Sequence, residues 1–441
     1  MSNKPKIIVL DDDPTGSQTV HSCLLLMRWD VDTLRIGLRD DSPIFFVLTN
    51  TRAMPTESAA TVTKEVCQNL KLALAAEGIT DFLIVSRSDS TLRGHYPIET
   101  DAIGSILGPF DAHFLVPAFF EGGRITRDSV HYLIIDGIPT PVHETEFAKD
   151  SVFGYHHSYL PKYVEEKTQG RISAETVERF LLADIRSGSR ERLLKLSSNQ
   201  CAVVDGEIQT DLNSFAVDVL AAASLGKRFL FRSAASILTA LAALPPQPIA
   251  AENMAKYVRQ GKPGAIIVGS HVKKTTQQLA ALLQVEGIAG IEVEVARLLD
   301  GENQSATLLN DILEKIRGVH NAGKTPVVYT SRQELTFQDV KTRLEFGVKV
   351  SSLLMDIVRG LPSDIGFLIG KGGITSNDIL STGLALTSAR LLGQILPGCS
   401  MVITNSDHPQ FPNLPVVLFP GNVGDADALG TIYKRLTKNT K

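Results

Sequence analysis

Short runs of apolar residues, many of them β-branched, alternate with helical patterns along most of this chain. One clear helical pattern spans residues 56–76, where Val62, Val66, Leu70 and Ala73 recur on one face. Continuously apolar strands must be covered on both sides, which is typical of parallel sheets flanked by helices. The pattern therefore predicts an α/β fold with mainly parallel sheets. The expected strands are 7–10, 44–48, 82–85, 114–116, 132–135, 202–204, 228–231, 265–268, 291–295, 326–329, 367–369, 401–404 and 416–419.

The length of the chain predicts more than one domain. Its 441 residues exceed the roughly 250–300 at which single hydrophobic cores stop growing. Proline-rich and Gly-Pro segments at 244–248 and 261–264 interrupt regular structure. We therefore expect two domains, each with its own sheet, and an active site in the cleft between them. The expected parts are a first domain over 1–240, a linker over 241–262 and a second domain over 263–441.

Composition excludes several classes of protein. A net charge of −4 gives no electrostatic reason to bind nucleic acid. The four cysteines lie far apart in the sequence, so we expect buried thiols and no zinc or redox pair. No run approaches the roughly 18 apolar residues of a membrane span, and the first residues lack a signal-peptide pattern. We expect a cytoplasmic protein, and a homodimer as the commonest closed form if the chain assembles.

Three consecutive carboxylates, Asp11, Asp12 and Asp13, directly follow the first expected strand and lead into a turn that ends at Gly16. In open parallel sheets, ligands bind beyond the carboxyl ends of the strands. A packed core would exclude three adjacent negative charges unless they were paired. The acidic turn therefore favours a catalytic role. The alternative is a solvated turn before a capped helix.

Polar residues also follow two later strands of the first half. The guanidinium group of arginine can donate two parallel hydrogen bonds to a carboxylate, while hydroxyl and carboxylate groups can hydrogen-bond to sugar hydroxyls. The candidate substrate-binding residues are Arg87, Asp89, Ser90, Arg93 and Gly94 in one loop and Arg124 in the next. The alternatives are a structural loop tied by an Asp89–Arg93 ion pair and a simple tight turn at Gly122–Gly123.

Three loops of the second half combine a strand end with glycines. No Walker A sequence occurs, but Gly269-Ser270, Gly372–Thr375 and Gly421–Gly424 each follow an expected strand. Glycine lets a phosphate approach the backbone, and exposed amides at a helix start bind anions. Together the loops predict a nucleotide site, although a glycine turn before a capped helix explains each loop taken singly.

These motifs, in this order, resemble the four-carbon acid sugar kinase family, which includes 3-oxo-tetronate kinases and threonate kinases. The resemblance extends from residue 7 to about residue 424, and the Asp89–Gly94 block is its most specific part. It implies an N-terminal acid-sugar-binding domain, a C-terminal ATP-binding domain and phosphorylation of a terminal hydroxyl. The chain departs from the family pattern at Pro14, Arg87 and residues 232–235, which leaves the substrate open. The implied nucleotide-binding residues are Ser270, Gly372, Gly373, Ile374, Thr375 and Gly421, to which we add Gly424 of the same loop.

Phosphoryl transfer needs an in-line hydroxyl, Mg²⁺ and a carboxylate that accepts the hydroxyl proton. We expect Asp12 or Asp13 to act as the base or to organise Mg²⁺, with no metal ligand assigned individually. Arg87 and Arg93 are expected to bind the substrate carboxylate, and Asp89 the sugar hydroxyls.

Two other functions remain open at this point. The pattern Asp11-x-Asp13-x-Thr15 also matches the nucleophile motif of haloacid-dehalogenase-type phosphatases, in which Asp11 would be the nucleophile and ATP would not be used. A two-lobed protein that binds a sugar acid without chemistry is the non-enzymatic alternative.

Overall fold

The computed structural model describes residues 5–299, 302–332, 335–337 and 339–438. The chain divides into two compact units, one up to Pro246 and one from Gln247. Each is an α/β unit, and every strand expected from the sequence is present, with its ends shifted by at most a few residues. Within the predicted linker 241–262, the segment Ala251–Tyr257 is a 3-10 helix, and Met254 is buried in the core of the second unit.

The sheet of the first unit has the strand order β2-β3-β1-β4-β11-β5-β10-β9, and its neighbouring strands are parallel. The strands are β1 (Lys6–Asp11), β2 (Leu24–Leu26), β3 (Ile44–Leu48), β4 (Phe82–Arg87), β5 (Ala112–Val116), β9 (Glu178–Phe180), β10 (Gln200–Val204) and β11 (Phe229–Ser233). Because the strands run the same way, the carboxyl ends of β1, β4, β11 and β5 lie at one edge of the sheet.

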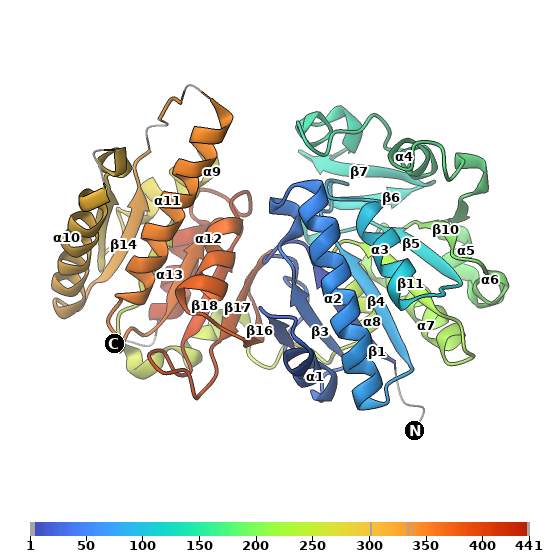
Figure 1. Ribbon diagram of the computed structural model, residues 1–441, viewed down its shortest axis with the longest axis horizontal. Helices are drawn as coiled ribbons and strands as arrows, with labels where there is room; N and C mark the ends of the chain where they lie inside the picture. Colours follow the sequence, from blue (N-terminus) through green and yellow to red (C-terminus); the bar gives the residue numbers. More distant parts are fainter. Residues whose placement is uncertain (1–4, 300–301, 333–334, 338, 439–441) are drawn as a thin grey trace. The chain divides into compact units, whose positions relative to one another are not determined.

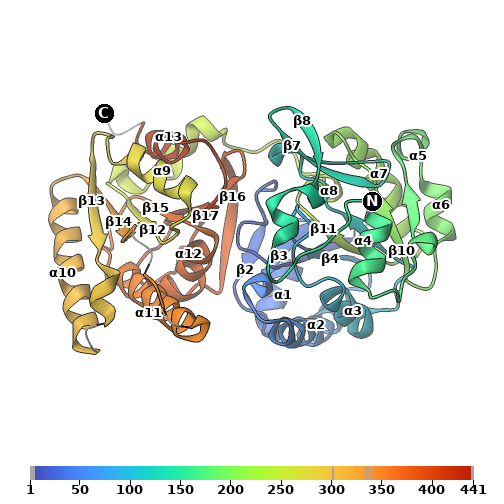
Figure 2. The same ribbon diagram turned by 90° about the horizontal axis from the view of Figure 1, so that it is seen from above.

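Helices cover both faces of this sheet. On one side lie α1 (Val31–Arg39), α2 (Thr56–Glu77) and α3 (Ile98–Leu107), and α2 and α3 lie side by side in Figure 1. The other side carries α7 (Gln209–Ala223) with α5 (Leu182–Ser187), α6 (Arg190–Lys195) and α8 (Ser236–Ala242) (Figure 2). Val66 and Leu70 of α2 pack with Ile8 and Phe45 of the sheet, so the helical periodicity of 56–76 marks the buried face as expected.

The expected strand 132–135 is real but does not join the parallel sheet, which corrects the sequence interpretation. It belongs to β7 (Val130–Ile135), the middle strand of a separate antiparallel sheet with β6 (Arg124–Arg127) and β8 (Ile138–Pro141). The reason is the two-residue turn Asp136-Gly137, in which both residues have positive φ, 50° and 81°. Such a turn returns the chain antiparallel to itself. Downstream of this sheet lies α4 (Leu160–Lys167).

The sheet of the second unit has the order β13-β14-β12-β15-β18-β17-β16. In this order, β13, β14, β12, β15 and β18 each run parallel to the next of these strands. β17 is antiparallel to both β18 and β16. The strands are β12 (Ala265–Val268), β13 (Ile288–Val293), β14 (Thr325–Thr330), β15 (Leu368–Lys371), β16 (Ser388–Leu396), β17 (Cys399–Ile403) and β18 (Pro415–Phe419). The helices are α9 (Lys273–Leu282), α10 (Glu302–Asn321), α11 (Val340–Arg359), α12 (Gly373–Asp378) and α13 (Ala428–Thr437).

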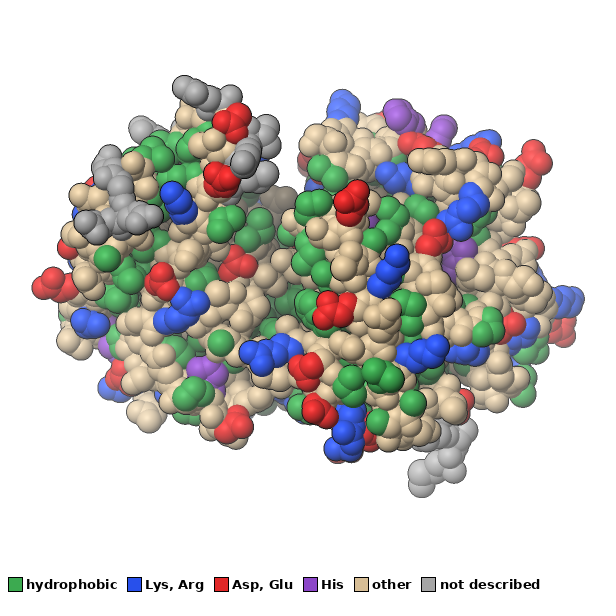
Figure 3. Space-filling model, viewed as in Figure 1, with side chains coloured by type: hydrophobic (Ala, Val, Ile, Leu, Met, Phe, Trp, Pro, Cys, Tyr) green, Lys and Arg blue, Asp and Glu red, His purple; other side chains and the backbone are tan. Residues whose placement is uncertain are grey.

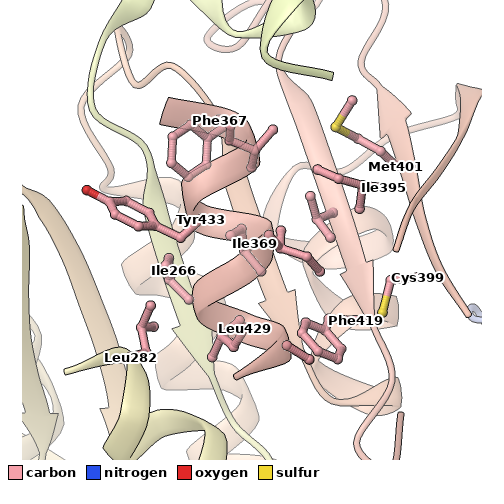
Figure 4. Close-up of a cluster of buried hydrophobic side chains, with 14 of the residues drawn as sticks. Ile266, Leu282, Phe367, Ile369, Ile395, Cys399, Met401, Phe419, Leu429 and Tyr433 are labelled. Atoms are coloured by element: carbon pink, nitrogen blue, oxygen red, sulfur yellow. The ribbon is translucent and has the colours of Figure 1, made fainter. Parts of the chain in front are cut away.

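One face of this second sheet forms a large hydrophobic core. Figure 4 shows Ile369 and Phe419 of the sheet packed against Leu429 and Tyr433 of α13. Cys399 belongs to the same cluster, and all four cysteines are free and buried, as expected. Among the described residues no helix combines the length and apolar character needed to cross a membrane. Figure 3 shows acidic and basic side chains interspersed over the viewed faces of both units.

Candidate functional site

The acidic turn lies at the carboxyl end of β1, at the edge where several strand ends meet. Asp11 is the last residue of β1 and is fully enclosed, with one carboxylate oxygen 3.2 Å from Nη1 of Arg87. Burial raises the pKa of the Asp11 carboxyl to about 7, which Arg87 opposes. A phosphatase nucleophile must reach phosphorus, so the enclosure of Asp11 disfavours that alternative.

Asp12 and Asp13 share one cation that the sequence interpretation missed, Arg52. Its Nε donates to Oδ2 of Asp12 at 3.1 Å, and its Nη1 lies 3.4 Å from Oδ2 of Asp13. Arg52 follows β3, the neighbour of β1 in the sheet. Applying the carboxyl-end rule to β3 would therefore have found it.

The two carboxylates differ in accessibility. The side chain of Asp12 is 2% exposed and also accepts a 2.7 Å hydrogen bond from Ser88 Oγ. The side chain of Asp13 is 22% exposed, and its Oδ1 accepts from the amide and the hydroxyl of Thr15. Burial would raise the pKa of Asp13, but Arg52 and Arg87 hold it below its usual value. Asp13 is thus an ionised carboxylate that a ligand can reach.

The loop after β4 brings the predicted residues together. Arg93 Nε donates to Asp89 Oδ2 at 2.8 Å, so the structural ion pair considered above exists. Burial would raise the pKa of Asp89, but Arg52 and Arg93 lower it below its usual value. Gly94 has φ of 128°, and a Cβ there would overlap Ser88 Oγ and lie 2.6 Å from Nη2 of Arg232. Only glycine fits that position without displacing the loop.

Arg87 and Arg232 are buried cations already paired with acids. Arg87 lies 3.2 Å from Asp11 and 3.8 Å from Asp12. Arg232, at the end of β11, pairs with Glu99 of α3 at 2.5 Å and donates to Ser88 Oγ at 2.7 Å. Both arginines therefore form ion pairs within the protein at this edge of the sheet. The role of Arg87 toward a substrate carboxylate stays a prediction.

Arg124 differs from the other arginines of this edge. It begins β6, and its Nη1 donates to the carbonyl of Gly122. Its Nε is buried without a hydrogen-bond partner, and no carboxylate lies within ion-pair distance of it in the described part of the chain. Burial lowers the pKa of Arg124, while the nearby charge of Asp89 raises it. An anionic ligand would supply the missing partner.

A small hollow opens at the carboxyl ends of β4, β5 and β11, and Asp13 and Arg124 are not among the residues that line it. Tyr163 of α4 also contributes to its wall, which the sequence did not indicate. The hollow is lined by Ser88, Asp89, Leu92, Arg93, Leu115, Pro117, Tyr163, Arg232 and Ser233. Hydroxyls, a carboxylate and guanidinium groups thus gather around one small space in this part of the sheet edge.

The glycine loops of the second unit follow β12, β15 and β18, which are parallel neighbours. Thr275 Oγ1 of α9 lies 3.3 Å from Ser270 Oγ and 3.2 Å from the carbonyl oxygen of Gly421, to which it can donate, so Thr275 links the first and third loops. Gly372 has φ of 122°, and a Cβ there would lie 3.0 Å from Cβ of Ser270. The predicted nucleotide residues therefore share one sheet edge.

The remaining predicted residues of this edge lie on and around short helical turns. Gly373 begins α12, with Ile374 64% exposed and Thr375 buried. Gly424 has φ of 78°, at the end of the third loop. Two cations that the sequence interpretation did not single out, Arg332 after β14 and Lys371 at the end of β15, reach the same edge.

Taken together, these features define a two-domain α/β protein with a small polar site in its first domain and a glycine-lined edge suited to phosphates in its second. Residues 7–241 match the sugar-binding N-terminal domain and residues 265–429 match the nucleotide-binding C-terminal domain of the four-carbon acid sugar kinases. The chain belongs to this family of sugar acid kinases.

Similar proteins span the whole chain. A D-erythronate kinase from Heliobacterium modesticaldum is 25% identical over 467 aligned positions, covering 98% of this chain and 96% of that protein. A Salmonella typhimurium structure described as a putative tRNA synthase has a TM-score of 0.72 at 18% identity, with both chains fully covered. A Haemophilus influenzae structure from a family of unknown function has a TM-score of 0.65 at 17% identity, covering 97% of this chain and 100% of that one. The two structures show that the fold is shared.

Proposed function

We propose that this chain is an ATP-dependent kinase that phosphorylates a terminal hydroxyl of a short sugar acid of about four carbons. Erythronate, threonate, their 3-oxo forms and branched analogues are the candidate acceptors. The similarity to D-erythronate kinase along nearly the whole chain supports this choice. The structural observation that carries it is Arg124, a cation without an acid partner among the described residues, beside Asp89 and Arg93.

The residues of the first domain have separate roles in this proposal. Arg124 binds the carboxylate of the acid, with Arg93 and Arg87 as further cations, and Asp89 binds sugar hydroxyls. Ser90 and Gly94 shape the loop that carries these groups. Asp12, enclosed by Arg52 and Ser88, positions the acidic turn.

Asp13 is the better placed of the two carboxylates to act on the acceptor, because it is the more exposed. The acceptor oxygen bonds to the γ-phosphorus while the bond from that phosphorus to the β,γ-bridging oxygen breaks. Its proton passes to the carboxylate of Asp13, and ADP leaves. The backbone amides of the Gly372–Thr375 and Gly421–Gly424 loops, with Ser270, hold the phosphates of ATP.

Mg²⁺ is part of the proposal as a charge-neutralising partner of the phosphates. Among the described residues no cluster of three or more acidic, histidine or cysteine side chains could enclose a metal ion. Mg²⁺ in kinases is commonly held by only one or two carboxylates, with water and substrate phosphates completing its shell. Asp12 or Asp13 could supply such a carboxylate, and a residue that holds Mg²⁺ would not also be the base.

A coupled ADP-release screen tests the function. The purified protein with ATP and Mg²⁺ is assayed against erythronate, threonate, their 3-oxo forms, branched analogues and the neutral polyol erythritol. With one of these acids we expect the protein to release ADP. The amount of ADP should equal the amount of phosphorylated acid, which phosphorus NMR measures. Phosphate release from phosphorylated acids without ATP would instead indicate a phosphatase. Tight acid binding by calorimetry with no turnover on any acid would indicate a binding protein.

A further inference from the structure

Two basic side chains have no assigned role at the sheet edge that carries the three glycine loops of the second unit. The first is Lys371. It is the last residue of β15, directly before Gly372, and its side chain is fully buried. Nζ donates to the carbonyls of Pro420 at 2.6 Å and Gly421 at 3.3 Å, and lies 3.8 Å from the ring centre of Phe419. No carboxylate pairs with it in the part of the chain that the structure describes. Burying a charged lysine without a counter-charge costs free energy of folding. A purely structural role therefore does not explain a lysine at this position.

The second cation is Arg332, two residues beyond β14. Its Nη1 donates to the carbonyl of Ser270 at 2.7 Å, and its Nε and Nη2 bind the carbonyl and hydroxyl of Thr330. The side chain is half-buried, and within the described residues it too has no acid partner at ion-pair distance. Burial lowers its pKa, while the nearby Glu292 raises it.

The two cations converge on the same loops from neighbouring strands. Arg332 holds the Ser270 turn, Lys371 holds the Pro420–Gly421 turn, and Thr275 joins Ser270 to Gly421. β14, β12, β15 and β18 are adjacent in that order, so both cations lie within the span of the three glycine loops. A guanidinium and an amine that pair with no acid among the described residues, at an edge rich in backbone amides, form an arrangement that an anion completes.

We propose that Arg332 and Lys371 form a two-cation receptor for the phosphate chain of the nucleotide, Arg332 by direct contact and Lys371 from beneath the Pro420–Gly421 turn. This inference rests on the proposed function only in taking the anion to be a nucleoside phosphate. Lys371 acts as a positioning residue, since it holds the turn that faces the ligand.

The protonation of Lys371 follows from its surroundings. Burial, with a smaller contribution from the ammonium of Lys274 on α9, lowers the pKa of its amine to about 7. The thiol of Cys399 on β17 supplies no counter-charge, because burial raises its pKa to about 12. Near pH 7 the amine is therefore only partly charged, and a polyphosphate bound over the turn will draw a proton onto it.

The first test compares adenosine, ADP and ATP binding by calorimetry without acceptor, in the wild-type protein and in Arg332→Met and Lys371→Met. Each variant should lose about tenfold in affinity for ATP, less for ADP and little for adenosine, because charge-assisted contacts scale with the phosphates present. Lys315→Met, an exposed lysine of α10, is the matched control and should bind all three normally. Equal losses for all three ligands, or no loss, would overturn the proposal.

The second test uses the wild-type protein and does not depend on a variant folding. ATP binding measured near pH 7 in two buffers of different ionisation enthalpy should show an uptake of about half a proton per nucleotide at this amine. Lys371→Met should lower the proton uptake by that amount, leaving only the exchange from the titrating γ-phosphate of ATP, and Lys371→Arg should restore ATP affinity without restoring the amine's share of the uptake. Proton uptake that is unchanged in Lys371→Met would contradict the role of Lys371. Phosphate-dependent nucleotide binding without acid-dependent ADP release would overturn the proposed function and leave this receptor intact.

Discussion

The hydroxyl of Tyr155 donates a 2.7 Å hydrogen bond to the carbonyl of Thr91, in the middle of the loop that carries Asp89 and Arg93. His131 Nε2 binds the carbonyl of Ser90 at 2.8 Å, and Tyr163 binds that of Leu92, also at 2.8 Å. Three successive carbonyls are thus held by side chains of the segment between β5 and β10. The small antiparallel sheet, α4 and the segment between them therefore hold the loop that carries Asp89 and Arg93 in one conformation.

Replacing Tyr155 by Phe removes one of these bonds with little change in volume. A net hydrogen bond is worth about 1 kcal/mol, so KM for the acid should rise about three- to tenfold while KM for ATP stays unchanged. Steady-state kinetics with each substrate varied in turn measures this. Tyr132→Phe is the control, because Tyr132 of β7 makes no hydrogen bond to the loop in the described part of the chain. An equal rise in both KM values in Tyr155→Phe would show that the loop is not specific to the acid.

Replacing Arg124 by Gln removes the charge that we assign to the substrate carboxylate. KM for the preferred acid should rise about 10- to 100-fold, because hydrogen bonds between charged groups are among the strongest in proteins. Any residual phosphorylation of erythritol, which lacks the carboxylate, should be unaffected. Arg127→Gln, an exposed arginine of the same strand paired with Glu207, is the matched control. If both variants lose acid binding equally, the carboxylate is bound elsewhere.

The enclosed carboxylate of Asp12 and the accessible carboxylate of Asp13 should respond differently to amidation. Asp13→Asn is expected to slow single-turnover phosphoryl transfer about 10²- to 10⁴-fold, as for loss of a general base, with a smaller loss of stability than Asp12→Asn. Asp12→Asn leaves Arg52 poorly paired, so it should lower the free energy of unfolding by about 3 kcal/mol. Rapid-quench kinetics and urea unfolding separate the two effects. Near-normal rates in both variants would exclude the acidic turn as the base.

The buried imidazole of His131 makes stability depend on pH. Burial lowers its pKa from 6.5 to about 4 in the folded chain, so the neutral form is favoured on folding. Stability from this group is fully present above pH 6.5 and is lost as pH falls toward 4, by about 3 kcal/mol at most. His131→Gln should remove this loss, so its free energy of unfolding relative to the wild type should increase between pH 7 and pH 4.5. Urea unfolding at both pH values checks it. A pH-independent difference would show that His131 is not buried in its neutral form.

Much of the architecture was predictable from local pattern. The apolar runs and the helical face of 56–76 identified the strands and the mainly parallel class of the sheets, because a strand buried on both faces is continuously apolar and a helix with one buried face is apolar every three to four residues. The acidic turn and the glycine loops were found because strand ends gather at one edge of a parallel sheet. The Asp136-Gly137 turn carried a hairpin signal that, taken into account, would have removed 132–135 from the parallel sheet.

By itself the sequence determined which chemical groups lie at the strand ends: the carboxylates of Asp12 and Asp13, the arginines and the glycines. Only the tertiary structure decided which of those charges are already neutralised within the chain. Arg52 pairs with Asp12 across 40 residues, whereas Arg124 and Lys371 are left without an acid within the described residues. The physical reason is that ion pairing depends on distances of a few ångströms between side chains from different strands, and such distances leave no trace in local spacing.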